Sequence, residues 1–151
     1  MNKLIYSILF MLVVLVSSCK VTDNATNTDI VCNLEDYKNI EIEFGYITTK
    51  NHSNHYLLKN NLITNSSNND TIRLESKKAC NLFDKTTKLF LKIQTLNVPA
   101  DSNNYIIYYN KKDNVLLRAL WNPIHNNIGN EAFKSLFQEF MDITNSKDTN
   151  E

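Results

Sequence analysis

The chain has 151 residues, with 16 basic residues balanced by 16 acidic ones and only two glycines. This length suits one domain rather than two well-built hydrophobic cores. The balanced charge gives no electrostatic reason to expect a nucleic-acid partner, and the lack of glycine argues against a loop that wraps a nucleotide phosphate closely. Asparagine is frequent instead, and because it tolerates positive φ we expect it to take the place of glycine in turns.

The first segment, residues 4–16, is a run of mostly apolar side chains behind Lys3. As a helix this run would be about 20 Å long, which is shorter than the roughly 30 Å of a bilayer core. One positive residue in front and small residues behind are typical of a secretory signal. The run closes on Val16-Ser17-Ser18-Cys19, which resembles the lipobox of bacterial lipoproteins.

The resemblance implies that residues 1–18 are a signal peptide and that Cys19 becomes the acylated first residue of the mature protein. Several acyl chains on one residue make anchorage to a membrane essentially permanent. Lys20 follows in place of the Asp that retains many lipoproteins in the inner membrane, so the resemblance implies a cell-envelope protein and favours the outer membrane. The alternatives are an ordinary cleavage site beside an incidental cysteine, and an uncleaved anchor.

Residues 20–29 are polar, and we expect them to form a flexible tether ahead of one folded domain, residues 30–145. The domain holds two further cysteines, Cys32 and Cys80. Thiols commonly pair in an oxidising, exported compartment, so a Cys32–Cys80 disulfide is expected, with two separately buried thiols as the alternative. Closing this loop would stabilise the domain by about 4 kcal/mol in the chain-entropy model.

Alternating side chains in the first half of the domain predict β-strands. Residues 40–46 alternate apolar and polar side chains, as a half-buried strand requires. A second strand is expected at 56–59, turning at Asn60-Asn61 into a third at 62–64. A fourth is expected at 71–75, after a polar loop. Consecutive strands of this kind predict a β-meander.

From Ser76 the spacing of apolar residues changes to three and four, which predicts a helix that has Ser76 as its N-cap and stops by Val98-Pro99. Two strands, 105–109 and 115–121, then flank a polar turn and predict a β-hairpin.

Asn130 is expected to cap a last helix with an apolar stripe from Ala132 to Ile143, and residues 146–151 are expected to be a disordered tail. The predicted fold is a two-layer α+β domain, in which helices pack on an antiparallel sheet in the order β-meander, helix, β-hairpin, helix. This layout resembles that of small lipoproteins of Bacteroidota.

The sequence offers few residues for catalysis. The GxSxG elbow of hydrolases and the HExxH motif of zinc peptidases are both missing, and Cys32 and Cys80 are not spaced as a redox pair. Glu41 and Glu43 share one face of a predicted strand, behind Glu35-Asp36, and an envelope hydrolase that uses such carboxylates is the alternative hypothesis for the function. The simpler interpretation is a solvated outer face, so no catalytic residue is assigned.

Histidines offer a weak indication of a metal site. His52 and His55 lie in one predicted loop and His125 lies in another. Zinc binds such ligands, but no Asp, Glu or Cys cluster accompanies them at ligand spacing, so neither a metal nor another cofactor is expected.

Aromatic side chains are concentrated on the predicted hairpin, at Tyr105, Tyr108, Tyr109 and Trp121. Amphipathic aromatic residues serve binding hot spots, but they also favour strands, and with two helices to pack on the sheet we expect at least half of these four residues in the core. We therefore expect a non-enzymatic interaction module that is anchored to the membrane through Cys19. It would present its hairpin or sheet edge to an envelope protein or glycan.

Overall fold

The structure, a computed structural model, describes residues 32–48, 53–98, 100–124 and 131–146. All of them belong to one unit, which spans Val31–Glu151. The predicted signal peptide, the predicted lipidation site Cys19, the predicted tether and residues 147–151 lie outside the described residues, and so do Asn130, His52 and His125.

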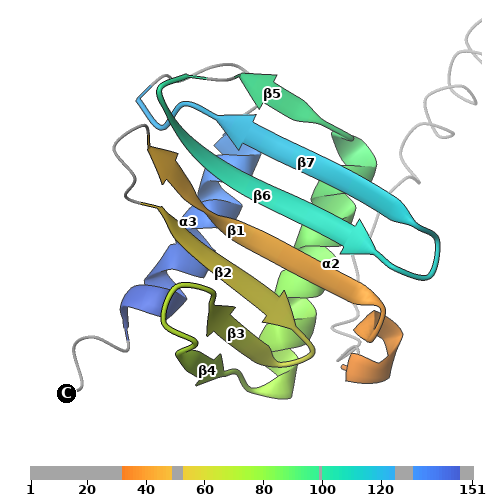
Figure 1. Cartoon of the computed structure of the whole chain (residues 1–151). Helices are drawn as coiled ribbons and strands as arrows, with labels where there is room; N and C mark the ends of the chain where they lie inside the picture. The colour runs from red at the N-terminus through yellow and green to blue at the C-terminus, as the bar shows by residue number, and fades with distance from the viewer. Residues whose placement is uncertain (1–31, 49–52, 99, 125–130, 147–151) are drawn as a thin grey trace, which may run out of the picture. The chain divides into compact units, whose positions relative to one another are not determined.

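Seven strands of the described residues form one sheet in the spatial order β4-β3-β2-β1-β6-β7-β5 (Figure 1). Neighbouring strands are antiparallel, except for β5 and β7, which are parallel. The strands are β1 (Ile40–Thr48), β2 (Asn54–Lys59), β3 (Leu62–Asn65), β4 (Thr71–Arg73), β5 (Leu96–Val98), β6 (Ser102–Asn110) and β7 (Val115–Trp121).

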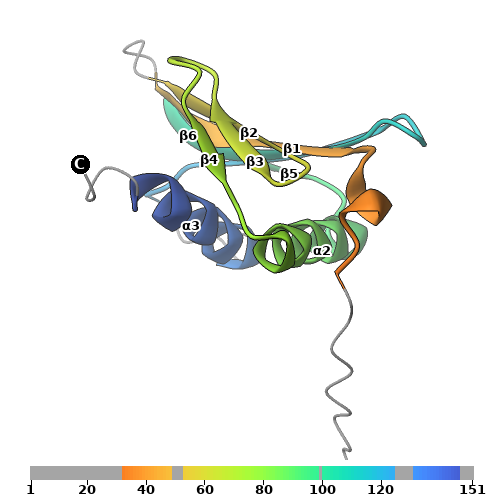
Figure 2. The same ribbon diagram turned by 90° about the horizontal axis from the view of Figure 1, so that it is seen from below.

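The described helices are α2 (Ser76–Lys92), α3 (Glu131–Asn145) and a short 3-10 helix, η1 (Leu34–Tyr37). Both α-helices lie on the same side of the sheet (Figure 2). No described helix covers the opposite side, the open face, which carries Glu41 and Glu43 of β1 and the residues paired with them on neighbouring strands. The predicted α+β class with a mostly antiparallel sheet is thus confirmed, whereas neither η1 nor β5 was part of the predicted order.

The covered face packs on the helices through aliphatic and aromatic side chains. Ile42 and Phe44 of β1 are fully buried, as the alternation along this strand predicts. Phe140 of α3 stacks on Phe44 with ring centroids 4.4 Å apart. Phe90 of α2 packs on Phe133 of α3 at 5.1 Å, so the two helices share one core with the sheet.

Helix α2 differs from the prediction at both ends. Glu75, with extended backbone, is the N-cap and forms no side-chain cap hydrogen bond, so the prediction of Ser76 as the N-cap is wrong by one residue. Leu74 explains the offset, because it is buried and its N–H donates to Asn61 O, which holds the chain extended as far as Glu75. The helix ends at Lys92, ahead of the unpredicted β5.

Asparagine forms the tight turns. Asn60, Asn69 and Asn114 have φ of 53°, 61° and 51°, and they are the described non-glycine residues with positive φ. Each lies in a connection between consecutive strands, namely β2–β3, β3–β4 and β6–β7. The expectation that asparagine would replace glycine in turns is therefore confirmed.

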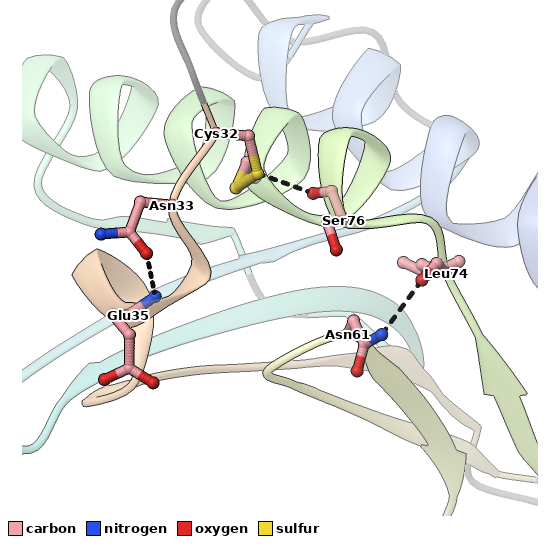
Figure 3. The surroundings of a disulfide bond; sticks show 7 residues. Cys32, Asn33, Glu35, Asn61, Leu74 and Ser76 are labelled. Atoms are coloured by element: carbon pink, nitrogen blue, oxygen red, sulfur yellow. Dashed lines mark hydrogen bonds between the residues drawn. A yellow bond between two sulfur atoms is a disulfide. The ribbon is translucent and has the colours of Figure 1, made fainter.

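Cys32 and Cys80 form a disulfide with a Cα–Cα distance of 5.9 Å, which confirms the predicted pair. The bond ties the segment ahead of η1 to the second turn of α2 (Figure 3). The Cys32 sulfur also lies 3.0 Å from Ser76 O. Because a disulfide sulfur carries no hydrogen, this is a close contact in the oxidised protein and a hydrogen bond only after reduction.

Candidate functional site

The four aromatic residues predicted as a binding face do not share one face. Trp121 is 0 % exposed and Tyr108 is 6 % exposed on the covered side, where Trp121 meets Phe137 edge-on and Tyr108 packs against Phe90. These two residues pack in the core instead of forming a binding face, because the space between sheet and helices needs large side chains. The other two tyrosines lie on the open face, opposite residues of β1, but Tyr105 is buried there and only Tyr109 is partly exposed.

Strand pairing defines the open face, since residues directly opposite one another point to the same side of a sheet. Glu43 pairs with Leu57 and with Ile107, and Ile107 pairs in turn with Arg118. The same reasoning from Glu41 and Gly45 completes the set. The open face carries Glu41, Glu43, Gly45, Ile47, His55, Leu57, Lys59, Leu62, Thr64, Thr71, Arg73, Asn97, Asn103, Tyr105, Ile107, Tyr109, Leu116, Arg118 and Leu120.

Glu41 occupies a charged cluster on this face. Lys59 Nζ lies 3.0 Å and Lys111 Nζ 2.6 Å from Glu41 Oε1. Partial burial would raise the pKa of Glu41, but the two ammonium groups outweigh that effect and hold the pKa below its ordinary value. Glu41 is therefore an ionised carboxylate that joins β1 to β2 and to the turn after β6.

Glu43 takes part in a hydrogen-bonded chain on the same face. The Tyr105 hydroxyl donates to Glu43 Oε1 at 3.1 Å, and His55 Nδ1 lies 2.5 Å from the same hydroxyl. With its proton directed to Glu43, the hydroxyl accepts from His55 Nδ1–H. Burial of Tyr105, followed by the charge of Glu43 and the hydrogen bond to it, raises the tyrosine pKa far above its ordinary range.

Gly45 makes room for the hydrogen-bonded side chains of His55 and Tyr105. A Cβ at Gly45 would lie 2.0 Å from Asn54 O and 3.1 Å from the Tyr105 hydroxyl, so a larger residue could not sit here without moving β2. Tyr105, directly opposite on β6, is 2 % exposed although no described helix covers its side of the sheet.

Arg73 of β4 and Arg118 of β7 are the only arginines in the sequence, and both lie exposed on the open face. No described carboxylate forms an ion pair with either one. They lie five strands apart, which is about 24 Å at the usual strand spacing. The sequence alone could not place these arginines on the same face as Glu41 and Glu43. That placement depends on the register between paired strands.

Charge is unevenly distributed over the molecule. Among the described residues, the open face carries three cations, Lys59, Arg73 and Arg118, and Lys111 reaches Glu41 from the turn after β6, against the two carboxylates Glu41 and Glu43. The whole chain, in contrast, is neutral. Both carboxylates already have partners within the chain. Lys59 and Lys111 are in turn paired with Glu41, so the charged groups of this face that have no described ion-pair partner are Arg73 and Arg118.

Comparisons with protein-family models, with curated proteins and with solved structures gave no match to this chain. None of the described helices is long and apolar enough to cross a membrane. Within the described ranges, no three His, Cys, Asp or Glu side chains are grouped so that they could hold a metal ion. Of the three histidines considered as ligands, His55 is described, and its Nδ1 is engaged with Tyr105.

The helix layer carries a polar hollow of about 670 Å³. An ion pair between Lys85 and Glu139, with Nζ and Oε2 2.8 Å apart, joins α2 to α3 beside it. None of the residues predicted as a site lines this hollow. Its lining residues are Lys78, Ser135, Gln138, Glu139, Asp142, Ile143 and Ser146.

Proposed function

We propose that this protein is a lipid-anchored lipoprotein of the bacterial envelope whose open face binds an acidic surface of another envelope protein. Anchorage through Cys19, with the outer membrane as its location, follows from the resemblance of residues 16–19 to a lipobox and from Lys20. The Cys32–Cys80 disulfide supports export, because disulfides persist in oxidising compartments.

The observation that carries the binding proposal is the pair of exposed arginines on a sheet face that no described helix covers. Arginine and tyrosine are enriched where binding energy concentrates in protein interfaces. Arg118 lies among apolar neighbours, since Ile107 is directly opposite and Leu116 and Leu120 flank it on the same face of β7. An acidic group that docks there meets a guanidinium with no competing partner among the described carboxylates.

The partners of Glu41 and Glu43 favour binding over hydrolysis. A carboxylate acid must hold a proton near neutral pH, but the lysines beside Glu41 lower its pKa. Glu43 accepts the Tyr105 hydroxyl, and neither carboxylate lines the described hollow. Tyr108 and Trp121 are buried, so their rings cannot stack on a sugar, which favours a protein over a glycan as the partner.

Metabolic labelling with radioactive palmitate tests the anchor. We expect label in the wild-type chain and none after Cys19→Ser, with the variant released from membranes. Cys80→Ser is the matched control and should keep the label. A wild-type chain whose Cys19 sulfur is unmodified by mass spectrometry would contradict the anchor.

Site-specific photocrosslinking in intact cells tests the binding face. A photoreactive residue at Leu116 (63 % exposed, open face) should yield a discrete adduct with one protein, whereas the same residue at Leu91 (75 % exposed, on α2) should not. The adduct should weaken when Arg73 and Arg118 are both changed to Glu. Equal adducts from both leucines, an adduct that ignores the arginines, or a glycan in place of a protein would each refute the proposal.

A further inference from the structure

The outer edge of β7 is only partly paired. Strand β5 pairs with Ala119–Trp121, the last three residues of β7. Within the described part of the chain, no strand pairs with the outer edge of residues 115–118, and Figure 1 shows this half of β7 at the margin of the sheet. Since backbone groups of a strand point alternately to its two sides, two of these four residues direct N–H and C=O groups outward.

Side chains along this edge are mostly apolar, and all but the partly buried Leu117 are exposed. Val115 is 38 % and Leu116 63 % exposed, and the end of the β6–β7 pair extends beyond the helix layer (Figure 2). Apolar side chains thus lie near both faces of an unpaired backbone edge. An edge of this kind accepts an additional strand, which gains backbone hydrogen bonds from the edge and specificity from alternate side chains.

Arg118 gives the edge its charge preference. Arg118 is the charged residue of segment 115–118, it is exposed, and it has no described acidic partner. On an added strand, a residue directly opposite Arg118 would lie within side-chain reach, and a carboxylate there would form a cross-strand ion pair.

We infer that the partner binds by adding one extended segment to the edge of β7 at residues 115–118, with an acidic side chain opposite Arg118 and apolar side chains toward Val115 and Leu117. This inference rests on the proposed function and specifies how the acidic partner engages the sheet.

A second copy of this chain fits the edge less well. Two copies paired antiparallel about a two-fold axis would place residues of the same face opposite one another. Arg118 could then meet only even-numbered residues, which are Lys112, Asn114, Leu116 or Arg118 of the second copy. None of them is acidic, so self-pairing leaves the guanidinium without a carboxylate.

Hydrogen exchange measured by mass spectrometry on the full-length protein in nanodiscs tests the mode of binding. The probe is an acetylated, amidated eight-residue peptide in which valine alternates with glutamate, and the control peptide alternates valine with lysine. We expect the glutamate peptide to slow exchange of the amides at 115–118 in a saturable manner. N-methylation of alternate peptide nitrogens along the bonding edge should abolish this protection, although it leaves the side chains unchanged.

Charge reversal at the two arginines gives a matched comparison. Arg118→Glu should weaken the glutamate peptide about fivefold and transfer the preference to the lysine peptide, whereas Arg73→Glu should change neither. Equal loss in the two variants, or protection that survives N-methylation, would refute strand addition while leaving the open-face proposal intact. Concentration-dependent dimers that protect the same amides would refute the assigned occupant. Absence of the Leu116 photoadduct would instead remove the proposed function itself.

Discussion

The two faces of the sheet use the same strands for different purposes. On the covered face, apolar side chains such as Ile42 and Phe44 are fully buried against α2 and α3. On the open face, the residues next to them in the chain, Glu41 and Glu43, form ion pairs and hydrogen bonds with other strands. A single alternating strand thus supplies both the core and a charged outer surface.

The contrast between the two faces separates the residues that stabilise the fold from those that we propose for binding. Burial of large apolar side chains supplies most of the free energy of folding, whereas exposed ion pairs contribute little. The open face is therefore free to carry groups that stabilise the fold weakly, such as Arg73 and Arg118. Changes on the two faces should have separable effects, on unfolding and on binding respectively.

Phe140→Ala, a substitution on the covered face, should lower the stability more than any other change considered. Phe140 is fully buried and stacks on Phe44, so its truncation leaves a cavity between α3 and the sheet and should lower the free energy of unfolding by about 3–5 kcal/mol. Urea denaturation measures this loss. Leu116→Ala, an equally apolar truncation on the open face, should cost less than about 0.5 kcal/mol. Similar losses in the two variants would contradict the division between the faces.

Loss of the Cys32–Cys80 bond should lower the stability by up to about 4 kcal/mol, because the bond closes a loop with a sequence separation of 48 residues. Denaturation of the double variant Cys32→Ser, Cys80→Ser measures the loss, and a reductant should reproduce it in the wild type without affecting the variant. Binding at the open face should be retained below the unfolding transition. A reductant that destabilises the double variant as well would show that its effect arises elsewhere.

The covered face was the part that the sequence could predict. Alternation in residues 40–46 and the three- and four-residue spacing after Ser76 reflect burial on one side, which is a local property of each segment. Strand β5 escaped because three residues carry too little periodicity, and its partner Ala119–Trp121 lies some twenty residues further along the chain. The cap of α2 was displaced because a tertiary contact, the burial of Leu74, holds the chain extended ahead of the helix.

The open face was not predictable from local pattern. The chain from His55 through Tyr105 to Glu43 joins three strands, and Glu43 and Tyr105 lie 62 residues apart in the sequence. Only the register between β1 and β6 brings them together. The sequence left Trp121 open between a binding face and the core for a related reason, since an aromatic strand residue looks the same whether it faces a helix or solvent. The role of such a residue depends on which face of the sheet the helices cover.

Tyr105→Phe sharpens the comparison, because Tyr105 lies on the open face and is nevertheless buried. Removing its hydroxyl leaves His55 and Glu43 without their shared partner, and should cost about 1–3 kcal/mol. Tyr109→Phe is the matched control and should cost less than about 0.5 kcal/mol, since its hydroxyl bonds to Asn114 on the surface at 3.5 Å. Urea denaturation at neutral pH compares the two variants.

The same tyrosine should make the protein sensitive to alkali. The raised pKa means that the folded state keeps the Tyr105 proton at a pH at which the unfolded chain, with its ordinary pKa of 10.0, has lost it. Stability from this group is therefore complete below pH 10 and falls as the pH rises above that value. Tyr105→Phe should flatten the decline, and an unchanged decline would assign it to other groups.

Glu41→Gln, which removes a charge from the open face, should lower the stability least. The substitution removes ion pairs with Lys59 and Lys111 that are largely exposed on the lysine side, so we expect a loss of about 1 kcal/mol or less. Because the folded-state pKa of Glu41 lies below its ordinary value of 4.5, its contribution is present above that pH and is lost as the pH falls through the folded-state pKa. Thermal unfolding of wild type and variant should therefore converge in acid, and added salt should reduce their difference at neutral pH because exposed charges are screened.

Asp113→Asn, at the exposed turn between β6 and β7, is the control for removing a carboxylate outside this cluster. A loss for Glu41→Gln that is large and independent of salt would place this cluster energetically with the covered face and would break the contrast between the two sides of the sheet.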